Sequence, residues 1–136
     1  MEFNLFFHFI GIIIALGAVT VIDSLGFISR KNKVWTQITI KAHHVTKPLI
    51  WIGTIIVLLS WIFMYENNLL SNIKSMLLLV MILNGSFLSF YVSPRLDKLA
   101  GKKVLLPNKL QSWIIVSMLI SFISWWSFVF ITILMV

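Results

Sequence analysis

The sequence of 136 residues contains no cysteine, and charged residues make up only 11% of it. The absence of cysteine excludes disulfides, iron–sulfur clusters, thiolate metal sites and cysteine nucleophiles. Soluble domains carry roughly 25% charged residues, so a soluble globular protein is also excluded. Redox chemistry in this chain would therefore depend on a bound cofactor.

Apolar residues make up 60% of the chain, and its mean hydropathy is +1.01. Four apolar runs, at residues 3–28, 48–65, 73–92 and 110–136, are each near the ~20 residues needed to cross a bilayer. They are continuous rather than alternating, which indicates helices and not the strands of a membrane barrel. We predict an all-α bundle of four transmembrane helices that forms a single domain, residues 1–136.

Basic residues are concentrated in two of the segments between these runs. The chain has 11 Lys and Arg residues, and all except Lys74 lie within 30–47 or 95–109. By the positive-inside rule both segments face the cytoplasm, so both termini face outward (N-out/C-out). This topology explains the net charge of +7, so no nucleic-acid partner is needed to account for it. The expected partner is the lipid bilayer.

The residues before Pro48 and four aromatic residues give further local predictions. Residues 34–46 (VWTQITIKAHHVT) lack helix breakers and form either an interfacial segment or an extended start of the second helix, bent at Pro48. Gly101 is expected in a turn. Aromatic residues near the predicted helix ends are expected in interfacial belts: Trp51, Trp61, Tyr65 and Tyr91.

Ionisable side chains inside a bilayer are costly, so each of them is a functional candidate. These residues are His8, Asp23, His43, His44, Lys47 and Lys74. On a helix, His8, Gly11, Ala15, Asp23 and Gly26 share a face that should point into the bundle. His8 and Asp23 are separated by about 22 Å along that helix, so they belong to two different clusters. A Ser–His–Asp hydrolase is excluded because these two groups cannot converge.

The first cluster pairs His8 with Lys74, which opens the third apolar run. A lone imidazole in an apolar bundle is a candidate axial ligand for haem iron, with Met76, Met81, water or another subunit supplying the second ligand. The alternative is a core histidine that is hydrogen-bonded to its neighbours.

The second cluster lies at the cytoplasmic side, where Asp23 reaches the depth of His43, His44 and Lys47. An Asp–Lys or Asp–His pair there either fixes two helices together or binds a ligand and relays protons. Adjacent helical residues point about 100° apart, so at most one of the two histidines faces Asp23.

Small polar residues in the last two runs indicate close helix packing. Ser117, Ser121 and Ser124 form a stripe in the fourth run, which indicates close packing or a hydrophilic path. In the third run, the side-chain amide of Asn84 needs a hydrogen-bond partner in the bundle. The adjacent Gly85 permits close approach of a neighbouring helix.

The segments IKSMLLLVMILNGSFLSFYVSPRL and SFISWWSFVF resemble an uncharacterised family of small bacterial four-helix membrane proteins. More distantly, the layout is similar to CopD-like proteins and to HemJ-type protoporphyrinogen oxidases, which have a His in helix one and a Lys opening helix three. His8 and Lys74 occupy those positions. The resemblance implies that this pair binds haem b or another porphyrin in a bacterial inner membrane. The sequence departs from the oxidase pattern at Asn84-Gly85.

The leading hypothesis is therefore a haem- or tetrapyrrole-binding membrane protein for electron transfer or tetrapyrrole oxidation. Lys74 would pair with a propionate, and Phe6, Phe7 and Phe9 would contact the porphyrin. The alternatives are a proton- or ion-coupled transporter or channel subunit that uses the Asp23 cluster, and a structural subunit without a ligand. In each case a homo-oligomer would help enclose the site.

Overall fold

The computed structural model describes residues 2–136, which form long helices joined by short turns. Helix α1 spans Glu2–Ile28 and is followed by a 3-10 turn, η1, at Ser29–Lys31. Helix α2 spans Lys33–Met64. The third span begins with α3, Leu69–Phe87, and continues through a π-helical turn, η2, Leu88–Val92, into α4, Ser93–Asp97. Helix α5 spans Asn108–Met135.

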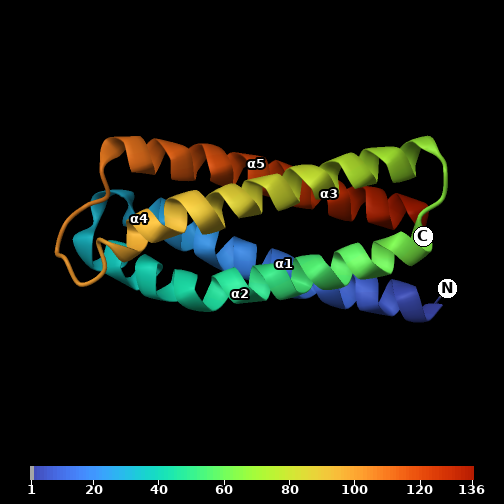
Figure 1. Cartoon of the computed structure of the whole chain (residues 1–136), viewed down its shortest axis with the longest axis horizontal. Coiled ribbons are helices and arrows are strands. Elements are labelled where there is room, and N and C mark those ends of the chain that lie inside the picture. The colour runs from blue at the N-terminus through green and yellow to red at the C-terminus, as the bar shows by residue number, and fades with distance from the viewer. Residues whose placement is uncertain (1) are drawn as a thin grey trace.

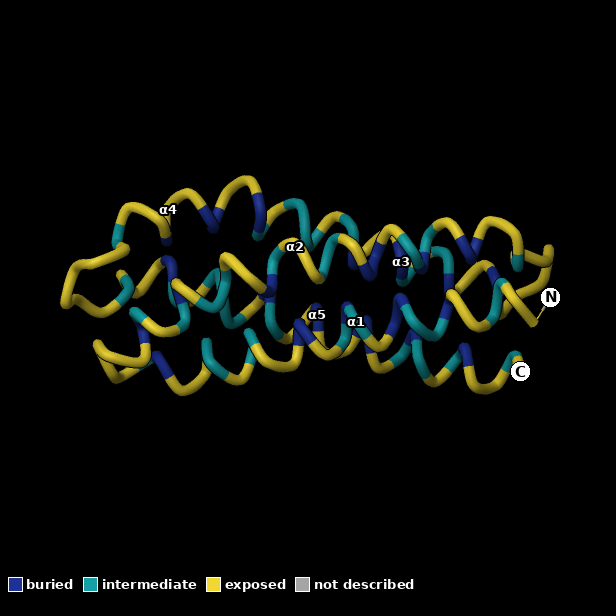
Figure 2. Tube along the Cα trace, turned by 90° about the horizontal axis from the view of Figure 1, so that it is seen from below, coloured by how far each residue is buried: buried dark blue, intermediate teal, exposed yellow. Residues whose placement is uncertain are grey.

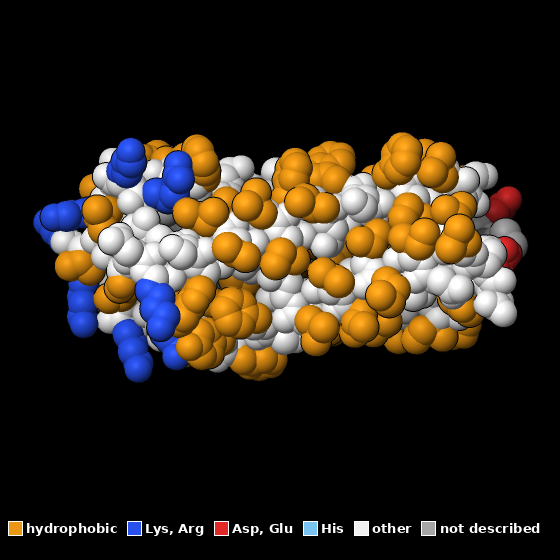
Figure 3. Space-filling view, turned by 90° about the horizontal axis from the view of Figure 1, so that it is seen from above, with side chains coloured by type: hydrophobic (Ala, Val, Ile, Leu, Met, Phe, Trp, Pro, Cys, Tyr) orange, Lys and Arg blue, Asp and Glu red, His pale blue; other side chains and the backbone are white. Residues whose placement is uncertain are grey.

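Four of these helical spans are long and apolar enough to cross a membrane: Glu2–Lys31, Lys33–Met64, Leu69–Asp97 and Asn108–Met135. They lie side by side along one axis (Figure 1). Both termini and the turn between α2 and α3 lie at one end, which we call the terminal end. The η1 turn and the loop before α5 lie at the other end. Lys and Arg side chains gather there and an apolar band covers the middle (Figure 3), so we call it the basic end.

Asparagine side chains cap two of the helices. Asn32 Oδ1 accepts hydrogen bonds from the backbone N–H groups of Val34 and Trp35, at 2.9 and 3.1 Å. Asn68 Oδ1 accepts from the N–H of Ser71 at 2.8 Å. These caps satisfy donors that the first turn of a helix leaves without a partner, so they fix where α2 and α3 begin.

The spans form two closely packed pairs, α1 with α2 and α3 with α5. Gly11 of α1 and Gly53 of α2 meet so closely that a Cβ atom on Gly53 would lie 2.7 Å from the Gly11 carbonyl oxygen. In the second pair, Asn84 Nδ2 donates to the Ser117 carbonyl at 3.1 Å, and Ser117 Oγ donates to Asn84 Oδ1 at 2.7 Å. The predicted partner for the Asn84 amide is confirmed. Ser117, Ser121 and Ser124 are all buried, and Ser121 also lines the cavity described below.

Buried residues face inward along all four spans (Figure 2). The main core cluster occupies the middle and the terminal half of the bundle and includes Ala15, Val57, Trp61, Trp125 and Phe128. A smaller cluster, formed by Ile40, Val92, Leu96 and Leu110, lies at the basic end. The interior between these two clusters is less tightly filled, and it contains the cavity described below.

The four predicted helices are confirmed, but two of them extend further along the chain than the apolar runs indicate. Helix α2 begins at Lys33 and runs through Pro48, so residues 34–46 are its extended start and not a separate interfacial segment. The third span continues past Pro94, because proline is tolerated in the first turn of α4. Gly101 has a φ of +79°, as expected for the predicted turn.

Candidate functional site

The His8 cluster lies in the terminal half of the bundle, where α1, α2 and α3 meet. Lys74 Nζ lies 2.8 Å from His8 Nε2, and His8 Nδ1 lies 2.8 Å from Ser60 Oγ. Ser60 Oγ in turn lies within donating distance of two backbone carbonyls of α2, those of Ile56 at 2.8 Å and Val57 at 3.0 Å. The donors therefore run in one direction: Lys74 donates to His8, His8 donates to Ser60, and Ser60 donates to a backbone carbonyl.

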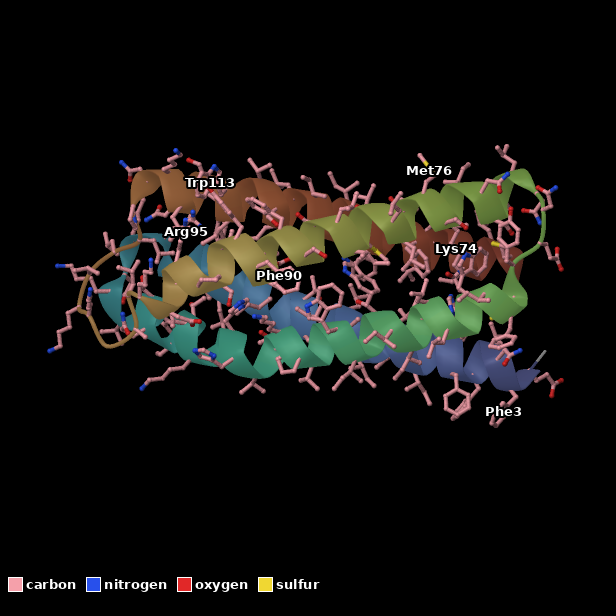
Figure 4. The ribbon with its side chains drawn as sticks, in the orientation of Figure 1. Phe3, Lys74, Met76, Phe90, Arg95 and Trp113 are labelled. Carbon is pink, nitrogen blue, oxygen red and sulfur yellow. The ribbon has the colours of Figure 1, made fainter. Side chains whose placement is uncertain are left out.

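Lys74 is buried without a carboxylate. Its side chain is 1% exposed and that of His8 is 0% exposed, and Figure 4 shows Lys74 directed into the bundle. The ammonium lies 4.3 Å from the ring centre of Trp61 and 4.7 Å from that of Phe128. Among residues 2–136 the only salt bridge is formed elsewhere, by His44 and Asp97. Two aromatic faces and one imidazole lone pair thus stabilise this charge.

The donor set at His8 does not fit haem iron. Both ring nitrogens already have hydrogen-bond partners, so coordination would require Lys74 or Ser60 to leave. A ligand of porphyrin size needs a pocket of roughly 300 Å³ or more. His8 is fully buried and does not line the bundle cavity. The meeting of His8 and Lys74 is as predicted, but its geometry is that of a packed hydrogen-bonded cluster.

Other residues expected around a porphyrin also point elsewhere. Met76, one of the alternatives for the second haem ligand, is 65% exposed and faces away from the bundle (Figure 4), so it is not placed to fill that role. Phe6 and Phe7 are exposed at 61% and 40%, because they lie on the outer face of α1. Phe9 instead packs against the main core.

We expect a detergent-purified sample to show no Soret band that depends on His8, with or without added haem. The reason is that neither nitrogen of His8 is free for iron. Absorption spectra recorded before and after dithionite check this. Sharp reduced α and β bands that disappear in His8→Ala but persist in the exposed-histidine control His44→Ala would contradict it.

The second cluster surrounds a cavity in the basic half of the bundle, with a volume of about 110 Å³. Its walls include Asp23 from α1, His43 and Lys47 from α2, and Asn84 from α3. It extends from the middle of the bundle, at Trp125, to the basic end. A water molecule occupies about 30 Å³ in the liquid, so the cavity has room for several waters or a small solute.

Polar side chains of α2 bridge this part of the seam between α2 and the third span, where that span forms η2 and α4. His43 Nε2 lies 3.1 Å from Ser93 Oγ, and Trp51 Nε1 donates to Ser89 Oγ at 2.8 Å. Lys47 Nζ donates to the carbonyl of Ser89 at 3.3 Å and lies 3.5 Å from Ser93 Oγ. We call these five residues the polar seam. It contrasts with the close backbone contact that joins α1 to α2.

The π-helical turn η2 explains why Lys47 finds an acceptor on the third span. The N–H of Ser93 donates to the carbonyl of Leu88, five residues earlier. Pro94, the next residue, has no N–H. The Ser89 carbonyl therefore lacks its usual helical donor, and the Lys47 ammonium supplies one. Such π turns are frequent at functional sites.

Two predictions for this cluster are corrected by the structure. Asp23 makes no ion pair with Lys47 or His43, because those side chains are directed toward serines of η2 and α4. His44 does not belong to the cluster. It points outward and lies 3.2 Å from Asp97, since adjacent helical residues point in different directions.

Two tryptophans are also placed differently from the prediction. Trp61 is buried at 4% exposure in the main core, and Trp51 belongs to the polar seam, so neither forms part of an interfacial belt. Tyr65 and Tyr91 are exposed at 46% and 39%, as expected. Ser89 and Ser93 were not identified from the sequence, although their spacing of four residues just before Pro94 was an available signal.

The fold is thus an all-helical bundle with four spans suited to a bilayer, as in multi-pass membrane proteins. Comparison of the chain with protein-family models, with curated proteins and with solved structures finds no match. Among residues 2–136, no group of three or more His, Cys, Asp or Glu side chains converges as a metal site would require. The cavity and the polar seam therefore provide the best basis for a function.

Proposed function

We propose that the chain is a subunit of a small proton- or ion-coupled membrane transporter whose solute site is the bundle cavity. The observation that carries this proposal is a cavity within the membrane-spanning region that is lined by ionisable residues from α1 and α2. Ionisable residues in such positions commonly mark ion pathways and proton relays. The volume of about 110 Å³ suits a small ion with part of its hydration shell.

The position of the cavity along the bundle supports transport more than passive packing. The cavity reaches Arg30 and Leu106 at the basic end. Toward the terminal end it is closed by the main core, in which Ala15, Val57 and Phe128 are each 0% exposed. A solute site that reaches one end of the bundle and is sealed toward the other by packed side chains fits one state of an alternating-access transporter.

Asp23 is the proposed coupling group. It lines the cavity but has no ion-pair partner among residues 2–136. A carboxyl group in a membrane interior that lacks a fixed cation gains stability from a proton or a mobile cation. Asp23 can therefore exchange such a charge without first breaking a salt bridge.

The polar seam supplies the movable contact. Its bonds join side chains of α2 to η2 and α4 of the third span, whereas close backbone contact holds α1 against α2. Rocking of the α1–α2 pair against the α3–α5 pair would open the seam without disrupting either pair. Rigid-body motion of this kind is a known route to alternating access.

The topology follows from charge. The basic end faces the cytoplasm and both termini face outward, because basic loops are retained on the cytoplasmic side. In a bacterium this places the chain in the inner membrane. A homo-oligomer would enlarge the solute path beyond what four helices enclose. Tetrapyrrole binding gains no support from the packing around His8.

Asp23→Asn is expected to reduce proton-coupled flux to the level of protein-free vesicles, because an amide cannot exchange the coupling charge. Purified protein is reconstituted into vesicles that contain a pH-sensitive dye, and Na⁺ and K⁺ gradients are applied in turn. Glu66→Gln is the control, since Glu66 is an exposed carboxylate in the turn between α2 and α3. Elution volume and helicity check folding. Wild-type flux at the background level, or equal flux in wild type and Asp23→Asn, would contradict the proposal.

A further inference from the structure

A cluster of cations and aromatic rings lies outside the cavity, where the third span meets α5 at the basic end. The guanidinium carbon of Arg95 lies 3.6 Å from the ring centre of Tyr91 and 5.8 Å from that of Trp113. Lys109 Nζ lies 5.1 Å from the same Trp113 ring. Figure 4 shows Arg95 and Trp113 close to each other at this end. We call these four residues the basic–aromatic cluster.

The sequence builds this cluster from two matching pairs. Tyr91 and Arg95 are four residues apart on the third span, and Lys109 and Trp113 are four residues apart on α5. Residues at this spacing share one face of a helix. The rings of Tyr91 and Trp113 then meet across the seam, with centres 5.0 Å apart. Phe87 stacks on Tyr91 at 5.3 Å and extends the ring platform.

The two cations of this cluster are exposed and have no counter-ion among the described residues. Arg95 and Lys109 are both exposed, and neither forms a salt bridge among residues 2–136. Arg95 is also held in place, because Nη1 donates to the carbonyl of Tyr91. A guanidinium that is already oriented loses less entropy when it binds an anion, and its remaining N–H groups suit phosphate oxygens.

The position of the cluster identifies its ligand. Arg95 lies near the end of the span Leu69–Asp97, and Lys109 lies near the start of the span Asn108–Met135. Residues at the cytoplasmic ends of apolar spans lie at the level where lipid headgroups meet the protein. An anionic phospholipid at this depth would place its phosphate at the cluster and its acyl chains along the adjacent apolar helices. Basic pockets between transmembrane helices bind anionic headgroups in this way.

We propose that the basic–aromatic cluster binds the phosphate of an anionic phospholipid of the bilayer leaflet at the basic end. Arg95 and Lys109 provide the charge, and Tyr91 and Trp113 provide the platform on which the headgroup rests. This site is separate from the proposed solute cavity, because none of the four residues lines that cavity. It does not depend on the transport proposal.

Lipid selectivity tests the proposal. Protein is reconstituted in phosphatidylcholine bilayers that contain increasing fractions of brominated phosphatidylglycerol, which quenches tryptophan fluorescence on contact. Repeating the series with Trp113→Phe isolates the Trp113 signal. We expect this signal to report preferential binding of phosphatidylglycerol. The double variant Arg95→Gln/Lys109→Gln should weaken this preference at least fivefold, because each cation near a membrane surface contributes about a fivefold change in binding.

The matched control is Lys102→Gln/Lys103→Gln, which removes the same net charge from two exposed loop residues. It should leave the preference within about twofold of wild type. An equal loss in both double variants would show diffuse attraction instead of a site and would overturn the proposal. Binding to phosphatidylcholine with equal strength would do the same. Displacement of the lipid by millimolar inorganic phosphate would assign the cluster to free phosphate, again contrary to the proposal.

Discussion

Gly53→Ala is expected to destabilise the bundle by about 3 kcal/mol or more, because overpacking in a filled interior costs about 1–3 kcal/mol and here the obstacle is backbone. A Cβ atom at this position would lie 2.6 Å from the Ala15 nitrogen and 2.7 Å from the Gly11 carbonyl oxygen. Backbone atoms cannot rotate away as a side chain does. Helices α1 and α2 would have to separate, and the contact that defines this pair would be lost.

Gly17→Ala is the matched control for this prediction. Gly17 lies on the same helix as Gly11, but a Cβ atom there meets nothing within 4 Å. Helix propensity alone then favours alanine, by up to about 1 kcal/mol. Unfolding in a mixed detergent titration, followed by tryptophan fluorescence, measures both variants. If Gly53→Ala unfolds at the same point as Gly17→Ala, the close contact of α1 and α2 is refuted.

The fold could be predicted from the sequence because a bilayer demands long apolar helices. The start of α2 could not be predicted from apolarity, since residues 34–46 mix Thr, Gln, Lys and His with apolar residues. Their helical state depends on the Asn32 cap and on packing at the basic end. Thr36 and Ile40, for example, are 1% and 2% exposed within this stretch.

The His8 cluster could be predicted because unpaired charge is costly in a membrane, which predicts that Lys74 meets a polar partner. Its detailed chemistry could not be predicted. Whether Nε2 of His8 is free for a metal depends on where the Lys74 side chain turns, and only the packing against Trp61 and Phe128 determines that. Ser60 was missed because a serine in an apolar helix commonly bonds to its own backbone.

The polar seam was the least predictable part. The pattern placed Asp23, His43 and Lys47 at one depth, and the structure places all three along one cavity. Helix periodicity did not show that Lys47 turns away from Asp23. Lys47 turns toward Ser89 because the π-helical turn leaves the Ser89 carbonyl without a helical donor. A regular α-helix would not leave this carbonyl free.

The His8–Lys74 contact makes a strong prediction about coupled substitutions. His8→Leu should destabilise the protein by about 3–5 kcal/mol, because removing one partner leaves a buried charge without compensation. Lys74→Met should cost less, about 1–3 kcal/mol, because it leaves only the neutral His8 Nε2 without a donor. Methionine has nearly the length and volume of lysine, so the contacts with Trp61 and Phe128 are largely kept.

The double variant His8→Leu/Lys74→Met should then be more stable than the sum of the two losses implies, by about 1–3 kcal/mol. Two apolar side chains leave neither a buried charge nor an orphaned nitrogen. Ser60 also remains satisfied, since its hydroxyl already donates to the carbonyl of Ile56. The free energies of unfolding of the wild type, the two single variants and the double variant are measured in one detergent mixture. Together they give the coupling energy between His8 and Lys74.

A surface histidine provides the comparison for this cycle. His44→Leu removes an imidazole whose side chain is 60% exposed and whose partner, Asp97, is 47% exposed. Exposed ion pairs contribute at most about 1 kcal/mol, so this variant should unfold close to wild type. Strict additivity of His8→Leu and Lys74→Met would mean that the two groups do not interact. Coupling with the expected sign would show that Lys74 lies against His8 in the folded protein, with its charge dependent on that imidazole.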